Sequence, residues 1–453
     1  MTEPAESDQP FSLLMAVHRD PVMASIFSER STVDSWLRVE AELARAQAAC
    51  GVIGEPEAVQ IAAAADRLRV DPAALWRATG TVGYPILPLV NALCAALSEE
   101  AAGKVHYGAT TQDVMDTGLA LQIAAACDRL DELAVVWGDG LVDLTLAHRG
   151  LTMAARTHGQ QAVPTTLGAK FAVYLAEVTR QRARIGRARS AAGFVSLFGA
   201  GGTSAALGPR ADQVRVRLAA ALGLRVTTVP WHVARDGLAE YGLVCASFAA
   251  SCVRFAREIV DLSRTEIREL GEAVGYQRGA SSTMPQKANP IISEAVIGLG
   301  ATAGALASAL FRAMEAGHER AAGEWQIEWH VLPELSLLAS SALRLTGHVA
   351  RELVVNDEAM AANLTADGGL LMSEAIMMRL APALGRDVAH DLVYRAAQSS
   401  RTSSRPLAEV LTEQLSAAHP GVTWDGNGLN PGDYVGEAEQ ICDAAVREWK
   451  ESR

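Results

Sequence analysis

The 453-residue sequence has no pair of cysteines at the C-x-x-C spacing that is typical of zinc sites and redox disulfides. Its six cysteines are scattered along the chain, at positions 50, 94, 127, 245, 252 and 442. In a reducing compartment, such cysteines are small buried apolar residues rather than disulfide partners or metal ligands. We therefore expect neither a disulfide framework nor a bound metal.

The sequence also lacks the features that direct a chain to a membrane. Residues 1–21 are polar and acidic, without the basic start and apolar centre of a signal peptide. No run of about twenty apolar residues is free of a charge or a glycine, so no membrane span is expected. Lysine and arginine (40) are fewer than aspartate and glutamate (52), and the formal charge of −12 excludes an electrostatic attraction to nucleic acid. We expect a cytoplasmic protein.

Strand-like runs are rare, and the best of them is the short RVTTV at 225–229. Helix-forming residues dominate the remainder, so the sequence predicts an all-α fold. The first clear helix covers residues 33–50 and is stopped by Gly51.

Long helices are expected between about residues 113 and 350. Within this region, apolar residues recur at steps of four and three, the seam of a helical bundle. These residues are Phe248, Cys252, Phe255, Ile259 and Leu262. We predict three helical domains: an N-terminal domain (1–110), a central bundle (111–352) and a C-terminal domain (353–453).

The most informative polar segment, GASSTMPQKANP, covers residues 279–290 and lies between two apolar helices. Asn289 is a good N-cap and Pro290 a good first residue for the helix that follows. Lys287 and Asn289 would then lie beside the free N–H groups at the positive end of a helix. The pattern predicts an anion-binding site, and an ordinary loop and cap is the alternative.

Two other polar segments stand out. Residues 155–166 contain Thr157 and His158, and residues 105–117 contain hydroxyls and amides with little charge. Alone, each is equally consistent with an ordinary loop or a helix cap. Together, the three segments resemble the three separated motif regions of the fumarase/aspartase superfamily. The segment around Ser281 is similar to the motif G-S-S-x-M-P-x-K-x-N, with Ala280 where glycine is usual.

The resemblance implies a homotetramer around a long central helical bundle, with each active site built from three subunits. It implies a reversible β-elimination on a small dicarboxylate, without a metal or an organic cofactor. It assigns Ser281 as the general base and Lys287 and Asn289 as ligands of a substrate carboxylate. His158, paired with Glu294, is implied as the general acid. The other expected substrate contacts are Thr110, Thr111, Gln112, Asp113, Thr157, Ser282 and Met284.

The flanking stretches VHYGATTQDVMDTG, PWHVARDGLAEYG and HERAAGEWQIEWHVLPEL are similar to the branch that holds 3-carboxy-cis,cis-muconate cycloisomerase and adenylosuccinate lyase. Gln286 and Ala288 stand where this branch commonly has histidine and arginine, which favours a smaller or less anionic substrate. We therefore predict a lyase that eliminates a nitrogen leaving group from a C2-substituted succinate, such as aspartate, nitrosuccinate or an N-substituted aspartate, and releases fumarate.

Two alternatives stay open: a cycloisomerase, in which a carboxylate adds across a double bond, and an inactive helical scaffold. A second carboxylate of the substrate would need a further cation. Arg19, Arg235 and Arg320 are the candidates, because a guanidinium fork fits a carboxylate. Pairing at the surface or between helices is the alternative role for each.

Overall fold

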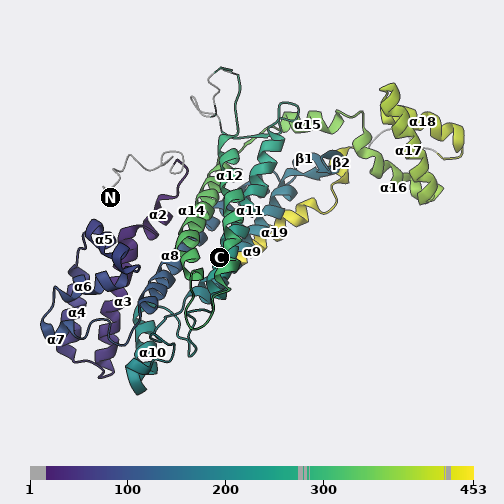
Figure 1. Ribbon diagram of the computed structural model, residues 1–453. Helices are drawn as coiled ribbons and strands as arrows, with labels where there is room; N and C mark the ends of the chain where they lie inside the picture. Colours follow the sequence, from purple (N-terminus) through teal and green to yellow (C-terminus); the bar gives the residue numbers. More distant parts are fainter. Residues whose placement is uncertain (1–16, 274–278, 280–282, 285, 423, 425–429) are drawn as a thin grey trace. The chain divides into compact units, whose positions relative to one another are not determined.

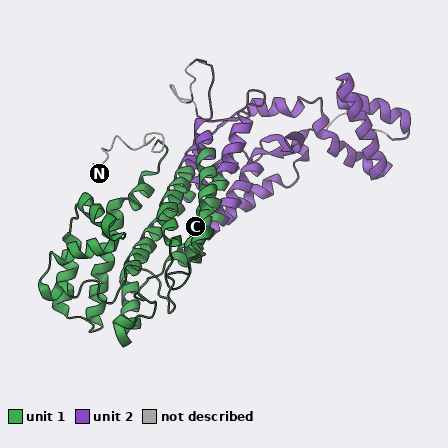
Figure 2. Ribbon diagram, viewed as in Figure 1, with its two compact units in different colours: residues 1–134, 181–252, 298–344 green, residues 135–180, 253–297, 345–453 purple. Residues whose placement is uncertain are grey.

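The computed structural model describes residues 17–273, 279, 283–284, 286–422, 424 and 430–453, so Ser281 and Ser282 lie outside the described residues. The chain is mostly helical, which confirms the predicted all-α class (Figure 1). It forms two compact units, each assembled from three separated ranges (Figure 2). Unit 1 comprises Met1–Ala134, Gln181–Cys252 and Gly298–Arg344, and unit 2 comprises Val135–Arg180, Val253–Ile297 and Leu345–Arg453. The three consecutive domains stay a prediction.

The N-terminal helices are short except for α3 (Glu29–Ala49). Ser28 caps it by accepting a hydrogen bond from the Ser31 N–H, and Gly51 follows its end with a φ of +66°. The predicted helix at 33–50 is therefore confirmed, and it begins four residues earlier than expected. The other helices of this region are α2 (Pro21–Ile26), α4 (Glu55–Arg67), α5 (Pro72–Val82), α6 (Ile86–Cys94) and α7 (Glu99–Ala102).

The long helices lie in the predicted part of the chain. They are α8 (Thr111–Ala147), α9 (Leu167–Ala192), α11 (Asp236–Leu262), α12 (Ile291–Ala307) and α14 (Glu324–Arg351). All five residues of the predicted seam on α11 are buried, with 2% exposure at most. In unit 2, the ring of Phe255 packs edge-on against Trp137 at 5.8 Å and against Tyr174 at 5.3 Å. The seam is thus a core feature.

The remaining helical elements are shorter. They are η2 (Ala205–Arg210), α10 (Ala211–Leu222), α13 (Ala309–Ala313), α15 (Asp357–Thr365), η3 (Leu370–Met372), α16 (Ser373–Leu384), α17 (Arg386–Ser403), α18 (Leu407–Ala418), η4 (Pro431–Tyr434) and α19 (Ala438–Glu451). Helices α16, α17 and α18 pack on one another around an apolar cluster of their own that includes Ile376, Leu392 and Leu411 (Figure 1).

The strands lie in places that the sequence did not predict. β1 (Thr152–Thr157) and β2 (Gln160–Thr166) form an antiparallel hairpin, and β3 (Leu270–Gly271) pairs with β4 (Val354–Val355). The strand-like run at 225–229 forms no strand, and of its residues only Arg225 forms an isolated bridge, with Phe194. The hairpin turns at His158 and Gly159, whose φ values of +52° and +75° are those of a two-residue turn with both centres left-handed.

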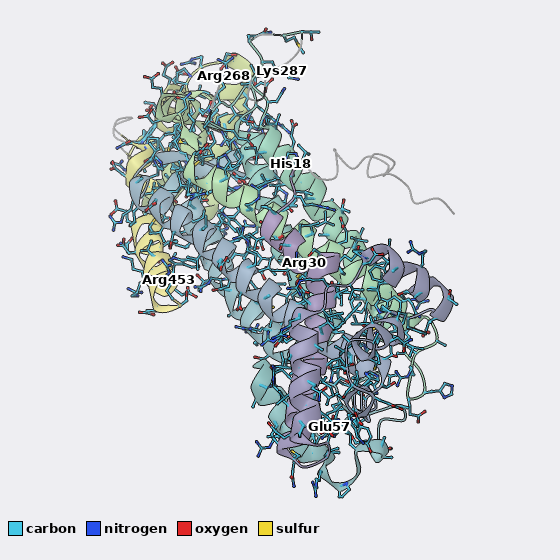
Figure 3. All side chains as sticks on the ribbon, turned by 90° about the vertical axis from the view of Figure 1, so that its left-hand side faces the viewer. His18, Arg30, Glu57, Arg268, Lys287 and Arg453 are labelled. Atoms are coloured by element: carbon cyan, nitrogen blue, oxygen red, sulfur yellow. The ribbon has the colours of Figure 1, made fainter. Side chains whose placement is uncertain are left out.

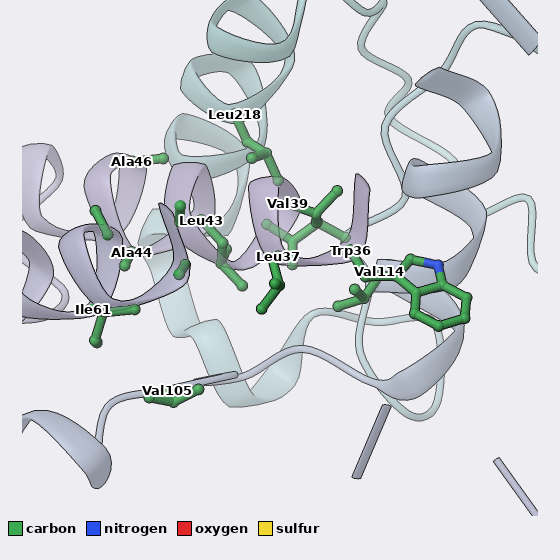
Figure 4. Packing of buried hydrophobic residues seen from close by; sticks show 14 of the residues in the cluster. Trp36, Leu37, Val39, Leu43, Ala44, Ala46, Ile61, Val105, Val114 and Leu218 are labelled. Atoms are coloured by element: carbon green, nitrogen blue, oxygen red, sulfur yellow. The ribbon is translucent and has the colours of Figure 1, made fainter. Parts of the chain in front are cut away.

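The apolar core of unit 1 joins α3, α4 and α10 to the start of α8 (Figure 4). Trp36, Leu37 and Leu43 of α3 and Ile61 of α4 are all nearly inaccessible to solvent. Gly118 of α8 lies so close to Trp36 that a Cβ there would be 2.6 Å from the indole. This close packing fixes the beginning of α8, which carries the first polar segment.

Candidate active site

The first polar segment is organised around the carboxylate of Asp113, which is buried in unit 1. Five donors reach it at 2.8–3.0 Å, one from three residues earlier in the chain and four from distant loops. They are the N–H groups of Thr110, Phe198 and Gly199, the Ser196 hydroxyl and His232 Nε2. Asp113 therefore ties the start of α8 to the 196–199 loop, and its oxygens face the protein.

The balance of these contacts decides the charge of Asp113. Burial raises the pKa of the carboxyl most, but the hydrogen bond and charge of His232 and the N–H groups of Phe198 and Gly199 outweigh it. The pKa of Asp113 is therefore held below its usual value, and the group stays ionised. His232 was not predicted, although it lies in the noted stretch PWHVARD.

Gln112 contacts Arg320, one of the predicted cations, through its side-chain amide. Its Nε2 donates to the carbonyl of His232 at 2.8 Å, and its Oε1 accepts from Arg320 at 3.2 Å. Arg320 also donates to the carbonyl of Ala200 and keeps part of its side chain accessible. Thr110 and Thr111 are partly exposed next to Gln112. Among the predicted substrate contacts, the structure thus joins Gln112 and Arg320 directly.

Arg235 lies in a closed network instead. All five of its N–H groups are used: they donate to both oxygens of Asp116, to both oxygens of Glu328 and to the carbonyl of Trp231. None of the three ionised residues is more than 3% exposed. In this arrangement the guanidinium has no donor left for a substrate carboxylate, so the geometry argues against the predicted clamp role of Arg235.

The pKa values of Arg235 and Glu328 are both raised, which favours the charged form of the arginine and the neutral form of the glutamate. Burial lowers the pKa of Arg235 most, yet the carboxylates of Asp116 and Glu328 raise it above its usual value. Burial also raises the pKa of Glu328, and the hydrogen bond and charge of Arg235 offset this only in part. Neither carboxylate was predicted, because a lone acid in a helix gives no sign of its partner.

His106 and Glu40 form a second buried pair close to the first segment. His106 Nδ1 lies 2.6 Å from Glu40 Oε1, and the other Glu40 oxygen is buried without a partner among the described residues. Burial lowers the pKa of His106, but the hydrogen bond and charge of Glu40 and the charge of Asp113 together raise it by more. The pKa of His106 therefore lies above its usual value. This pair links α3 to the loop that leads into α8.

The second polar segment is the β1–β2 hairpin of unit 2. Thr157 and His158 are exposed at its turn. Two residues before His158, Arg156 forms a bidentate pair with Glu269, with N···O distances of 2.7 and 2.8 Å. Glu269 is fully buried and also accepts from Asn363. The turn is therefore presented by an anchored strand rather than by a free loop.

The third segment leads into α12 and is also part of unit 2. Lys287 is exposed and lies four residues before the first residue of α12 (Figure 3). Met284 is 42% exposed, and Glu294 is exposed in the first turn of α12. Asn289 donates from both its N–H and its side-chain amide to the carbonyl of Gly279, at 3.1 and 3.0 Å. In this structure the Asn289 amide closes the loop.

The predicted anion site at the start of α12 is already occupied by the protein. Glu272 accepts hydrogen bonds from Ile292 N at 3.2 Å and from Ser293 N at 2.7 Å. The expectation of free N–H groups at this helix end is therefore wrong, because a carboxylate of the chain satisfies them. In the described part of the chain, no hydrogen bond or ion pair joins His158 to Glu294.

The described residues contain no group of three or more histidine, cysteine, aspartate or glutamate side chains that could hold a metal ion. By length and composition, the stretch Ile291–Ala313 could cross a membrane, but glycines 298, 300 and 304 interrupt it. Only 28% of its apolar window is buried within the chain. Most of that apolar window is therefore exposed in the single chain.

A sequence profile described as Lyase matches residues 15–303, and one described as Adenylosuccinate lyase C-terminus matches residues 369–445. The chain belongs to the fumarase/aspartase superfamily. It is 39% identical over 431 residues to the 3-carboxy-cis,cis-muconate cycloisomerase of Pseudomonas aeruginosa, with 94% of each chain covered. It is 33% identical to the N-acetyl-S-(2-succino)cysteine lyase of Enterococcus italicus, again with 94% of each chain covered.

Among solved structures of the superfamily, the 3-carboxy-cis,cis-muconate lactonizing enzyme of Pseudomonas putida superposes with a TM-score of 0.89 and 37% identity. The match covers 97% of this chain and 99% of that one. These relatives overturn the predicted nitrogen-leaving-group lyase, because the cycloisomerases match more closely than the named lyase. The expectation of a smaller or less anionic substrate, drawn from Gln286 and Ala288, therefore has no support from these relatives.

Proposed function

We propose that this chain is a cycloisomerase acting on 3-carboxy-cis,cis-muconate. The observation that carries the proposal is the near full-length similarity, at 39% identity, to enzymes with this name. The retained motif residues support it, since Lys287, His158 and Glu294 are all present and exposed in the single chain. Family membership alone does not distinguish cycloisomerases from lyases.

The chemistry is an intramolecular addition. One carboxylate oxygen of the substrate forms a C–O bond with an alkene carbon, and the π electrons move to the neighbouring carbon. That carbon then takes a proton, so no atom leaves and the product is an isomer. Between these steps, negative charge spreads onto the carboxylate conjugated with the reacting carbon. A site for this reaction needs cations and N–H donors at that carboxylate.

The proposed roles follow from this charge flow. Lys287 holds the carboxylate on which charge develops, and Arg320, oriented by Gln112, holds a second one. Ser281, the base of the eliminating relatives by resemblance, delivers the proton in the direction of addition. His158, with Glu294, orients the carboxylate that attacks. Exposure of Lys287 and His158 in the single chain supports the further proposal that each site is completed by other subunits.

We propose a homotetramer, and the exposed apolar surface of α12 and α13 supports it. Ile291, Phe311 and Met314 are 40%, 54% and 44% exposed, although each is a large apolar residue. A second copy of the chain would remove this surface from water. Light scattering on the purified protein tests the assembly, and a mass equal to one chain would refute it.

The activity is tested by following loss of the substrate's conjugated-diene absorbance. We expect Lys287→Met to lower kcat/KM by roughly a hundred- to a thousandfold, the effect of removing one group that stabilises developing negative charge. Lys450→Met, at an exposed lysine of α19, is the matched control and should leave turnover unchanged. Fumarate release from N-acetyl-S-(2-succino)cysteine, with no turnover of the muconate, would replace the proposal with a carbon–sulfur lyase.

A further inference from the structure

Glu272 links the two ends of the segment that carries Lys287. It directly follows β3, which is held in place by pairing with β4. Its carboxylate accepts from the N–H of Ile292 and from the N–H and hydroxyl of Ser293, at 3.2, 2.7 and 2.8 Å. These three bonds fix the first turn of α12 onto the end of β3. The two ends of this loop are therefore tied together.

A second tie lies inside this loop. The carbonyl of Gly279 accepts two hydrogen bonds from Asn289. Gly279 has a φ of +68°, and a Cβ there would lie 2.6 Å from the carbonyl oxygen of Asn289. Lys287 lies in sequence between Gly279 and Asn289, and this inner tie lies within the segment that Glu272 closes. Its position thus depends on both ties.

The same short strand also supports the His158 hairpin. Glu269 directly precedes β3 and holds Arg156 of β1, whereas Glu272 directly follows β3 and holds α12. A buried carboxylate at one end of β3 therefore anchors one predicted motif, and a carboxylate at the other end anchors another. Both contacts lie within unit 2. The four residues 269–272 form a common support for the two motifs.

We propose that Glu272 is a positioning residue for catalysis: by fixing the start of α12 to β3, it sets the placement of Lys287 and Glu294 toward the substrate. The proposal rests on the function proposed above. Glu272 does not touch substrate in this scheme. The negative charge and both oxygens of the Glu272 carboxylate contribute, because one neutral acceptor oxygen cannot accept all three hydrogen bonds equally well.

The test compares Glu272→Ala and Glu272→Gln with Asp71→Ala. Asp71 is the matched control, since its carboxylate caps α5 by accepting two N–H groups, from Ala73 and Ala74. We expect both Glu272 variants to lower kcat by roughly ten- to a hundredfold, the effect of a small misplacement of catalytic groups, with Glu272→Ala the worse. Asp71→Ala should lower the melting temperature to a similar extent and leave kcat within about twofold of wild type.

Rescue of the Glu272→Ala variant by an added small anion distinguishes a positioning role of Glu272 from a general loss of stability. Glu272 lines a cavity of about 210 Å³ with Asn289 and Asn356, so its removal leaves N–H groups facing a space that a small anion can enter. Formate should therefore restore part of the kcat of Glu272→Ala and leave that of Asp71→Ala unchanged. A folded Glu272→Ala enzyme with kcat within about twofold of wild type would overturn the proposal.

Amide hydrogen exchange tests the role of Glu272 without any substrate, because it reports how firmly the backbone of residues 286–294 is held. If wild type turns over no muconate, the proposed function fails, and exchange still reports the tie. Faster exchange in Glu272→Ala throughout residues 286–294 supports the positioning role. Faster exchange confined to Ile292 and Ser293 overturns it, because the cap would then be local.

Discussion

The buried network of Arg235 gives the sharpest prediction of stability. Replacing Arg235 with methionine leaves the carboxylates of Asp116 and Glu328, each about 1% exposed, without their cation. Breaking a buried ion pair by removing one partner costs about 3–5 kcal/mol. Two carboxylates are left here rather than one, so we expect Arg235→Met to lower the free energy of unfolding by the upper part of that range or more.

The pH dependence of this loss has a definite sign. Without Arg235, both buried carboxyls bind a proton more readily than their unfolded counterparts. A carboxyl whose folded pKa is raised favours the folded state at low pH and loses this advantage as pH rises through that pKa. The penalty in Arg235→Met should therefore be greatest near neutral pH and shrink as the pH is lowered toward about 5. Wild type should show a smaller recovery, because Arg235 offsets part of the effect of burial on the pKa of Glu328.

Urea unfolding, followed by far-ultraviolet circular dichroism, measures both effects. A triple variant, Asp116→Leu, Arg235→Met and Glu328→Met, is the control, because replacing all members of a buried ionic network with apolar residues is often neutral. It should recover most of the lost stability. A loss below about 1 kcal/mol in Arg235→Met, together with a raised KM, would refute the reasoning and restore the predicted role of Arg235 in binding a substrate carboxylate.

Three further predictions concern other parts of the molecule. His106→Asn should flatten the pH profile of stability. Because the pKa of His106 is raised in the folded state, its pair with Glu40 stabilises the fold fully below the ordinary pKa of 6.5, and this stabilisation is lost as pH rises through the folded pKa. Urea unfolding at several pH values measures the effect. Gly279→Ala should lower kcat more than Gly83→Ala in steady-state assays. Both residues have positive φ values and an alanine is strained by about 1–2 kcal/mol at either, but only at Gly279 does the new Cβ meet another residue, and equal kcat values would show that the Gly279 contact is dispensable. Overnight treatment with a chelator should leave turnover unchanged, and a strong loss would reveal a metal site missed in the sequence.

The helical fold could be predicted because its signals are local or periodic. The seam from Phe248 to Leu262 needs only spacing, and the end of α3 needs only Gly51. The β1–β2 hairpin was missed because its turn, His158-Gly159, is not one of the common turn pairs, and Pro164 within β2 argues against a strand. RVTTV, the most strand-like run, forms no strand because β-branched residues show strand preference only where a partner strand exists.

The candidate site shows the same limit. The residues of each motif were found as segments of sequence, whereas their supports were not. His232, Glu269 and Glu272 are far in sequence from the groups that they hold, up to 119 residues in the case of His232 and Asp113. A single acid or histidine in a helical protein does not reveal such a partner. Geometry also separated Arg235, enclosed by two carboxylates, from Arg320, which keeps an accessible side.

The most direct test of the central claim is the product formed from 3-carboxy-cis,cis-muconate in deuterated water, analysed by mass spectrometry and NMR. A cycloisomerase adds one solvent-derived hydrogen to carbon and loses no atom. We therefore predict a single lactone isomer of the substrate that carries one carbon-bound deuterium, formed by wild type and roughly a hundred- to a thousandfold more slowly by Lys287→Met. An unchanged substrate with wild type, or fumarate released from a substituted succinate under the same conditions, would contradict the account.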